Sequence, residues 1–288
     1  MEKYYRFAGI ELAVSIPEER MYREDLQLSA FRTDHVTDPH RYLVRVEPAL
    51  DAPVGVELAG QPGSRVYAAG DGYVRYHGAV DDGAEGAYCR AAHLGKNHEI
   101  TLTQSMVPGI VSARLVLNAL DVEHLVSAAG GVILHGSCIA WEGRAVVFTA
   151  PSGTGKSTQA ELWRMHRDAR IINGDRVVLL PENGLICAAG LPFSGSSRYC
   201  ENRILPLAAV VYLRQAPENT IRQLRGAAAF RRIWEGCTVN TWNREDVEAA
   251  SGMVESLLGS IPVYELACRP DAAAVETLEA ELRKQVRK

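Results

Sequence analysis

The segment Phe148-Thr149-Ala150-Pro151-Ser152-Gly153-Thr154-Gly155-Lys156-Ser157-Thr158 decides how the rest of this chain is interpreted. An apolar run, Ala145 to Thr149, leads into it, and a stretch compatible with a helix, Lys156 to His166, follows. A glycine-rich turn between a strand and a helix is the setting of a phosphate-binding loop (P-loop), where backbone N–H groups and the helix N-terminus face phosphate oxygens. The alternative is a chance glycine- and serine-rich turn before a surface helix.

The residue types in this loop suit different parts of a bound nucleotide. Gly153 and Gly155 let the backbone turn inward, Lys156 is placed to reach the β- and γ-phosphates, and the Ser157 hydroxyl is a ligand for Mg²⁺. The strict pattern begins with glycine where this chain has Ala150, a modest loss because that glycine mainly helps the strand to end. We therefore predict ATP and Mg²⁺ as cofactors, with the nucleotide bound by Ser152, Gly153, Thr154, Gly155, Lys156, Ser157 and Thr158.

Two parts of the chain differ in their hydrophobic pattern. Up to residue 108 there are short alternating or aromatic-rich segments, such as Tyr73-Val74-Arg75-Tyr76, separated by turn residues, which is typical of an antiparallel sheet. After Pro108-Gly109, longer apolar runs alternate with helical patterns. We predict an α/β fold, with a β-rich antiparallel domain over residues 1–108 and a P-loop domain with a mixed sheet and flanking helices over residues 109–288.

The composition argues against several classes of partner. A formal net charge of −4 over 288 residues provides no basic surface, so we expect neither nucleic acid nor a membrane as a partner. The six cysteines form no CxxC pair, which argues against a zinc knuckle or a disulfide framework. There is no apolar run of about 18 residues. Because the segment Met1-Glu2-Lys3-Tyr4-Tyr5-Arg6 also lacks the apolar core of a signal peptide, we expect a cytoplasmic protein.

The order of three motifs resembles the HPr kinase/phosphorylase family and its relative, ATP-dependent phosphoenolpyruvate carboxykinase. The motifs are His135-Gly136 on a strand, the Ser152 to Ser157 loop after a hairpin, and Gly174-Asp175-Arg176-Val177 on the following strand. The resemblance covers residues 130 to 215. The chain is also similar to the peptide serine kinases of lasso-peptide gene clusters. The resemblance implies a kinase-like P-loop fold and, since relatives form dimers or hexamers, a possible homo-oligomer.

The acidic motif departs from the family pattern. Two adjacent acids are usual there, the first resembling a general base and the second a metal ligand, whereas this chain has Gly174 followed by Asp175. Asp175 is therefore our candidate for both catalysis and, with Ser157, metal binding. Three possibilities stay open: Asp175 performs both tasks, another residue is the base, or the protein binds nucleotide with little turnover. Asp175 can also be read as an ordinary turn acid.

Two further catalytic candidates follow from the resemblance. His135 is similar to a family histidine near the phosphates, although a structural histidine at a strand end is a serious alternative. The polar stretch from Leu191 to Arg203 is typical of a mobile active-site loop, in which Arg198 and Arg203 would neutralise phosphate charge unless they are only solvated. The catalytic residues that we predict are thus Asp175, His135, Lys156 and Arg198.

These features favour a kinase that transfers the γ-phosphoryl group of ATP to a hydroxyl, with serine in a peptide or protein as the expected acceptor. Two other functions remain: phosphorolysis or hydrolysis of a phosphoserine at the same loop, and a nucleotide-sensing module without turnover.

Overall fold

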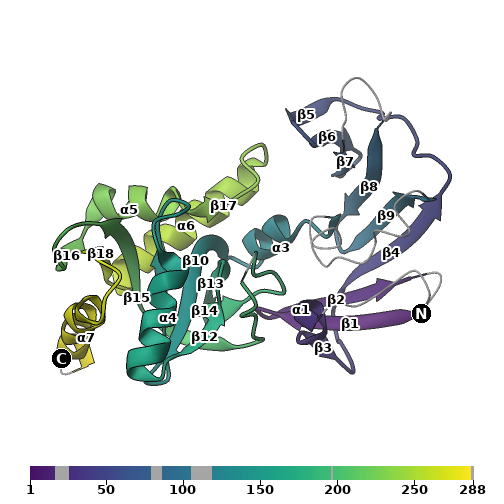
Figure 1. The fold of residues 1–288 in the computed structure, drawn as a ribbon. Coiled ribbons are helices and arrows are strands. Elements are labelled where there is room, and N and C mark those ends of the chain that lie inside the picture. Colours follow the sequence, from purple (N-terminus) through teal and green to yellow (C-terminus); the bar gives the residue numbers. More distant parts are fainter. Residues whose placement is uncertain (17–25, 79–85, 105–118, 196, 287–288) are drawn as a thin grey trace. The chain divides into compact units, whose positions relative to one another are not determined.

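The computed structural model describes residues 1–16, 26–78, 86–104, 119–195 and 197–286 (Figure 1). The chain divides into two compact units, Met1–Val122 and Glu123–Lys288, and each is described by itself. The boundary predicted at residue 108 lies outside the described residues.

The first unit is built on a nine-stranded sheet with the order β3-β1-β2-β4-β9-β8-β7-β6-β5. The prediction of an antiparallel sheet is wrong in one region, because β4 pairs in parallel with both β2 and β9. Strands joined by hairpins are antiparallel, whereas the chain leaves β4 for the whole β5–β8 meander before β9 returns beside it. The elements are β1 (Glu2–Phe7), β2 (Ile10–Ser15), α1 (Leu26–Ser29), β3 (Arg32–Thr33), β4 (His40–Glu47), β5 (Glu57–Gln61), β6 (Ser64–Ala69), β7 (Gly72–Gly78), β8 (Ala87–Leu94) and β9 (Asn97–Thr103).

The second unit follows the predicted alternation of strands and helices around a mixed sheet. Its main path runs β11-β10-β13-β14-β15-β18-β16, with β12 and β17 paired to β10. After α3 (Val122–Ala128), which begins at the last residue of the first unit, the elements are β10 (Val132–Trp141), β11 (Arg144–Thr149), α4 (Lys156–Arg167), β12 (Arg170–Asn173), β13 (Arg176–Glu182), β14 (Leu185–Gly190), β15 (Ile204–Gln215), β16 (Thr220–Leu224), α5 (Gly226–Trp234), β17 (Cys237–Thr238), α6 (Arg244–Ser260), β18 (Val263–Cys268) and α7 (Ala272–Val286).

Strand β10 pairs with four strands, β11, β12, β13 and β17, and its pairings with β13 and β11 position the candidate site. Its first half, Val132 to His135, pairs with β13, and its second half, Gly136 to Trp141, pairs with β11. The change occurs at Gly136, where a Cβ atom would lie 2.7 Å from the carbonyl oxygen of Phe148. A side chain there would prevent this close approach, so glycine suits the position at which the pairing with β13 ends and the pairing with β11 begins. The ends of β11 and β13 nearest the candidate site are thereby held beside His135.

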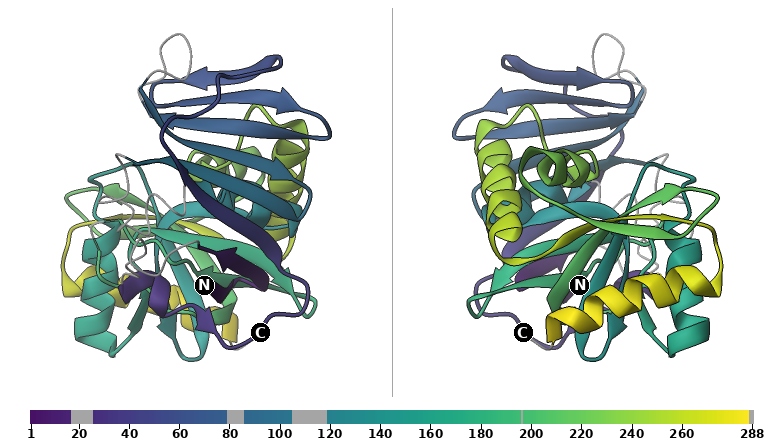
Figure 2. Two further views of the ribbon diagram at one scale, coloured as in Figure 1. Left: turned by 90° about the vertical axis from the view of Figure 1, so that its right-hand side faces the viewer. Right: turned by 90° about the vertical axis from the view of Figure 1, so that its left-hand side faces the viewer.

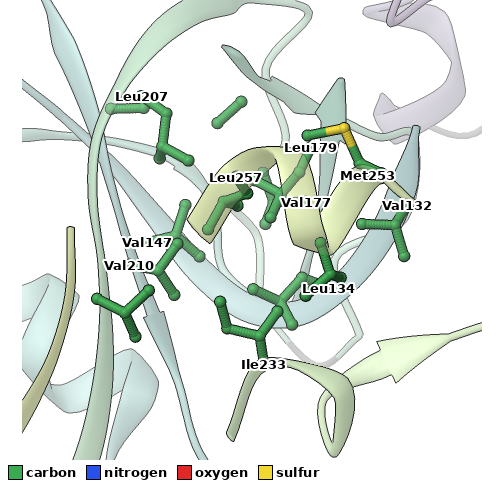
Figure 3. Packing of buried hydrophobic residues seen from close by; sticks show 14 of the residues in the cluster. Val132, Leu134, Val147, Val177, Leu179, Leu207, Val210, Ile233, Met253 and Leu257 are labelled. Atoms are coloured by element: carbon green, nitrogen blue, oxygen red, sulfur yellow. The ribbon is translucent and has the colours of Figure 1, made fainter. Parts of the chain in front are cut away.

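Helices cover both faces of this sheet. Successive strand residues point to opposite sides, and the apolar residues on each side pack against a different pair of helices. On β11, Val147 packs in a core with α5 and α6, whereas Val146 and Phe148 pack in a second core with α4 and α7. Figure 2 shows α6 and α7 on opposite faces of the sheet. In Figure 3, Ile233 of α5 and Leu257 of α6 lie among the valines and leucines of the strands.

Within the described residues, none of the helices combines the length and the apolar character that a membrane crossing requires.

Candidate functional site

The segment from Thr149 to Lys156 is a loop between a strand and a helix, as predicted. Strand β11 ends at Thr149, and α4 begins at Lys156. Gly153 and Gly155 have φ values of 77° and 115°, a region that side chains rarely adopt, so glycine is required here for backbone reasons. The N-cap of α4 is Gly155, and no side chain caps the helix. Its first N–H groups therefore remain available to an anion.

Lys156 is folded back onto the loop that precedes it. Its ammonium group donates to the carbonyl oxygens of Ala150 at 3.0 Å and Pro151 at 3.4 Å, and the residue is 8% exposed. Burial lowers the pKa of this lysine, and the negative charge of Asp175 partly opposes that shift. The ammonium group is thus held at the loop, within the electrostatic reach of Asp175.

Asp175 lies in the turn between β12 and β13, beside His135 of β10. The His135 Nε2 atom is 3.4 Å from Asp175 Oδ1, and the Arg176 Nε atom is 3.6 Å from Asp175 Oδ2. The Gly136 N–H group donates to the Asp175 carbonyl at 2.8 Å, which fixes the turn against β10. The hydrogen bond from His135 lowers the pKa of Asp175, and the charges of His135, Arg176 and Lys156 add to this effect while burial opposes it. The carboxylate is therefore ionised at neutral pH and carries a charge suited to a cation.

Asn173, which belongs to none of the motifs in the sequence, organises the turn. Its side chain is fully buried, and its Oδ1 atom accepts from the N–H groups of Asp175 and Arg176 at 2.9 and 3.0 Å. Its Nδ2 atom donates to the carbonyls of Leu191 and Phe193, both at 3.0 Å. One amide group thus joins the Gly174-Asp175 turn to the loop from Leu191 to Arg203.

That loop is packed onto the turn through two glycines. A Cβ atom on Gly195 would lie 3.0 Å from each carboxylate oxygen of Asp175. A Cβ atom on Gly174 would overlap with the side chain of Ser197. The α-carbon of Gly174 is therefore covered by the chain's own loop.

The Ser157 hydroxyl of α4 reaches the same turn, since its Oγ atom is 3.4 Å from the Gly174 carbonyl, and Ser137 Oγ donates to that carbonyl at 3.1 Å. The Ser157 hydroxyl thus contacts the turn that carries the ionised Asp175, and both side chains offer the oxygen ligands that Mg²⁺ prefers. Among the described residues, no three His, Cys, Asp or Glu side chains gather in a metal-binding group. A Mg²⁺ ion held here would take its other ligands from phosphate and water.

The structure does not bring Arg198 to the turn by any ion pair among the described residues, and its side chain is exposed, as is that of Arg203. Another arginine, Arg176, does lie beside Asp175, and its guanidinium is 4.9 Å from the centre of the Phe193 ring. The sequence indicates this arginine only by its position directly after Asp175. A catalytic role for Arg198 remains a prediction.

A cavity of about 450 Å³ adjoins the glycine-rich loop. The backbone of Gly153 to Gly155 forms one wall, and apolar side chains of Leu162, Leu213, Ala216 and Pro270 form others. Gln215 bridges the two, because its Nε2 atom lies 3.5 Å from the Gly153 carbonyl and 3.4 Å from that of Thr154. An apolar cavity of this size with a few polar groups has the dimensions of a small-ligand site.

A sequence model described as "SynChlorMet cassette protein ScmC" matches residues 110–269, which is more than half of the 288 residues. The chain belongs to the ScmC family. The region matched in this ScmC family member contains the glycine-rich loop, His135 and the Gly174-Asp175 turn. None of the curated proteins matches this chain. Among 54 matching chains of solved structures is the HPr(Ser) kinase/phosphatase from Coxiella burnetii, at 12% identity and a TM-score of 0.33, covering 54% of this chain and 99% of that one. A similarity this low supports no conclusion about this ScmC family member, and the resemblance to HPr kinases stays a prediction.

Proposed function

We propose that this protein binds ATP and Mg²⁺ at the loop from Ser152 to Thr158 and transfers the γ-phosphoryl group to a hydroxyl. The observation that carries the proposal is the convergence on one turn of Asp175, His135 and the Ser157 hydroxyl, directly beside the glycine-rich loop. Phosphoryl transfer needs positioned charges more than covalent chemistry from the protein, and this turn supplies them.

Each residue has a defined part in this reaction. The loop N–H groups and Lys156 would hold the β- and γ-phosphates, and Ser157 and Asp175 would hold Mg²⁺, which neutralises charge that develops on the phosphate oxygens. Lys156 leaves its two carbonyl partners when phosphate arrives, since those partners are neutral and phosphate is charged. The cavity beside Leu162 and Leu213 would take the base of the nucleotide.

Proton removal from the acceptor falls to Asp175 in this proposal. Its carboxylate is 27% exposed, so an acceptor hydroxyl can reach it, and no acid stands at Gly174. His135 orients the carboxylate through the 3.4 Å contact. A carboxylate with a lowered pKa is a weaker base, which predicts slow transfer rather than fast turnover.

A second candidate is a nucleotide sensor without turnover. The covered surface of Gly174 favours it, because Ser197 and Gly195 occupy space over the turn that an external acceptor would need. Such a sensor would bind ATP and be stabilised by it, but would release no ADP.

The deciding experiment is calorimetric titration of Mg²⁺ and ATP into the wild type and into Lys156→Ala, followed by an ADP-release assay with added serine peptides. Kinase activity predicts binding that Lys156→Ala weakens, together with ADP release that depends on the peptide. Binding without ADP release or phosphorylated product would support the sensor. Unchanged binding in Lys156→Ala would refute the assignment of the loop.

The cavity is tested separately with Ala216→Phe, which fills the apolar wall without touching the glycine-rich loop sequence. We expect it to weaken ATP binding but to leave the affinity for inorganic triphosphate unchanged, because triphosphate has no base. Leu185→Phe, at an exposed position on β14, is the matched control and should alter neither affinity. An equal loss for ATP and triphosphate would exclude the cavity as the base site.

A further inference from the structure

Ser197 places a hydroxyl group directly beside the Gly174-Asp175 turn. The three atoms nearest to a Cβ built on Gly174 include the Oγ and Cβ atoms of Ser197 and its Cα atom. This contact exists only because residue 174 lacks a side chain. The serine hydroxyl therefore stands against the α-carbon of the residue that precedes Asp175.

The loop orients this hydroxyl through a small network of hydrogen bonds. The Ser197 N–H group donates to the Ser194 carbonyl at 2.9 Å, and Ser194 Oγ donates to the Ser197 carbonyl at 2.5 Å. The Tyr199 N–H group donates to Ser197 Oγ at 3.1 Å. Within the described part of the chain, the Ser197 hydroxyl proton has no acceptor, whereas Ser194 is buried and its hydroxyl is engaged. Ser197 thus has a half-buried, positioned hydroxyl whose proton is not committed to a partner.

Ser197 and the Ser157 hydroxyl both contact the Gly174-Asp175 turn. Ser157 Oγ lies 3.4 Å from the Gly174 carbonyl, so the hydroxyls of Ser157 and Ser197 contact the same residue. The neighbouring Gly195 lies against the Asp175 carboxylate. The loop is held in this position by Asn173, through the carbonyls of Leu191 and Phe193. An acceptor hydroxyl, a carboxylate and the first turn of α4 are therefore assembled without a second molecule.

We propose that Ser197 is a phosphoryl acceptor within the chain itself, so that the protein phosphorylates its own loop. This inference rests on the proposed function and names one substrate of that site. The Ser197 oxygen attacks the γ-phosphorus of ATP, a new P–O bond forms, and the bond to the β,γ-bridging oxygen breaks. ADP leaves with that electron pair, and the hydroxyl proton passes to the Asp175 carboxylate.

The product changes the charge of the turn. A phosphoserine carries close to two negative charges at neutral pH and would stand over the turn that bears the Asp175 carboxylate. Repulsion then disfavours the packed position of the loop, and the space over Gly174 opens. Arg176, whose guanidinium lies beside Asp175 and over the Phe193 ring, is a cation that could accept the new phosphate.

The experiment incubates the full chain with Mg²⁺ and ATP and measures intact mass and phosphopeptides over time. Ser197→Ala, Ser197→Thr and Lys156→Ala are compared with Ser260→Ala, which removes an exposed serine hydroxyl at the end of α6. We expect one added phosphoryl group, located at Ser197, in the wild type and Ser260→Ala. It should be absent from Ser197→Ala and Lys156→Ala and retained, more slowly, in Ser197→Thr. Transfer within one chain also predicts that the first-order rate constant of phosphorylation does not change when the protein is diluted.

The experiment distinguishes failure of this inference from failure of the proposed function. If calorimetry shows ATP binding but no phosphate appears at residue 197, or phosphate appears at Ser194 instead, the inference is wrong, and the proposed function is then decided by ADP release with added serine peptides. A first-order rate constant that rises in proportion to protein concentration would overturn transfer within the chain. Absence of ATP binding in the wild type would remove both the inference and the function on which it rests.

Discussion

The Nε2 atom of His135 and the Oδ1 atom of Asp175 are 3.4 Å apart, although 40 positions of sequence numbering separate the two residues. The contact arises because β10 and β13 pair in the register His135 to Arg176, which brings the start of β13 to the middle of β10. The pKa of Asp175 is lowered, with the hydrogen bond from His135 as its largest cause. The histidine is therefore expected to act on the chemistry of the aspartate.

Replacing His135 by Ala should raise the pKa of Asp175 toward the ordinary value for an aspartate. In the wild type, the lowered pKa keeps the carboxylate charged to lower pH, and its contribution to stability is lost only as pH falls through the folded-state pKa. In the variant this contribution to stability should shrink, because the folded-state pKa approaches that of the unfolded chain, and Mg²⁺-dependent ATP binding should be lost at a higher pH than in the wild type. NMR titration of the aspartate carboxyl carbons measures the shift. His166→Ala, at an exposed position on α4, is the control, and an Asp175 pKa unchanged in His135→Ala would contradict the prediction.

Gly155→Ala should weaken ATP binding and lower the free energy of unfolding by about 1–2 kcal/mol, since an L-residue at a φ of 115° is strained. The matched control is Gly252→Ala in the middle of α6, where a Cβ atom would meet nothing within 4 Å. That control should stabilise the protein by about 0.5–1 kcal/mol through helix propensity and leave ATP binding unchanged. Calorimetry and urea unfolding measure both effects. Wild-type affinity in Gly155→Ala would show that the loop conformation is not needed for binding.

Gly174→Ala should lower the free energy of unfolding by about 1–3 kcal/mol, because its Cβ atom overlaps with the Ser197 side chain. In a Ser197→Gly background the same substitution should cost less, since the overlapping atoms are gone. A double-mutant cycle measured by urea unfolding gives the coupling energy between the two positions. Additive effects of the two substitutions would mean that the loop does not lie on Gly174 in solution.

His77 on β7 should make stability dependent on pH. Burial, with a smaller contribution from the charge of Arg75, lowers its pKa to about 4. The unfolded chain takes up the proton near the ordinary histidine pKa, so folding is favoured above that pH and is weakened as pH falls toward the folded value. Between those limits the loss should approach about 1.4 kcal/mol per pH unit. When the free energy of unfolding is measured with urea across this pH range, its slope against pH should be shallower for His77→Gln than for the wild type or His166→Ala. Equal slopes would contradict the prediction.

The parts of the fold that follow from local pattern were predictable. The apolar run of β11, the glycine-rich loop and the helix α4 stand in the expected order, because strand alternation and helix periodicity are local properties. The parallel pairing of β4 with β2 and β9 was not predictable in the same way. Partners so far apart in sequence leave no local signal, and the β-rich composition is the same for either direction.

The candidate site shows the same division between local and distant information. Gly155, Lys156 and Asp175 are visible in the sequence because their spacing has a chemical reason. Asn173 is not, since its partners are backbone carbonyls 18 and 20 residues away, and any residue type provides a carbonyl. The contact between Gly174 and Ser197 could not be predicted either. The sequence shows that residue 174 is glycine, but not that Ser197 packs against it.

The pairing of β10 with β13 along its first half and with β11 along its second half restricts how this chain can change in length. Residues before Gly136 are in register with β13, and residues after it are in register with β11. One inserted or deleted residue within β10 would shift one of the two pairings and turn its side chains to the opposite face. Insertions and deletions among relatives should therefore fall in connections such as the β13–β14 turn, while the ten residues from Val132 to Trp141 keep their number.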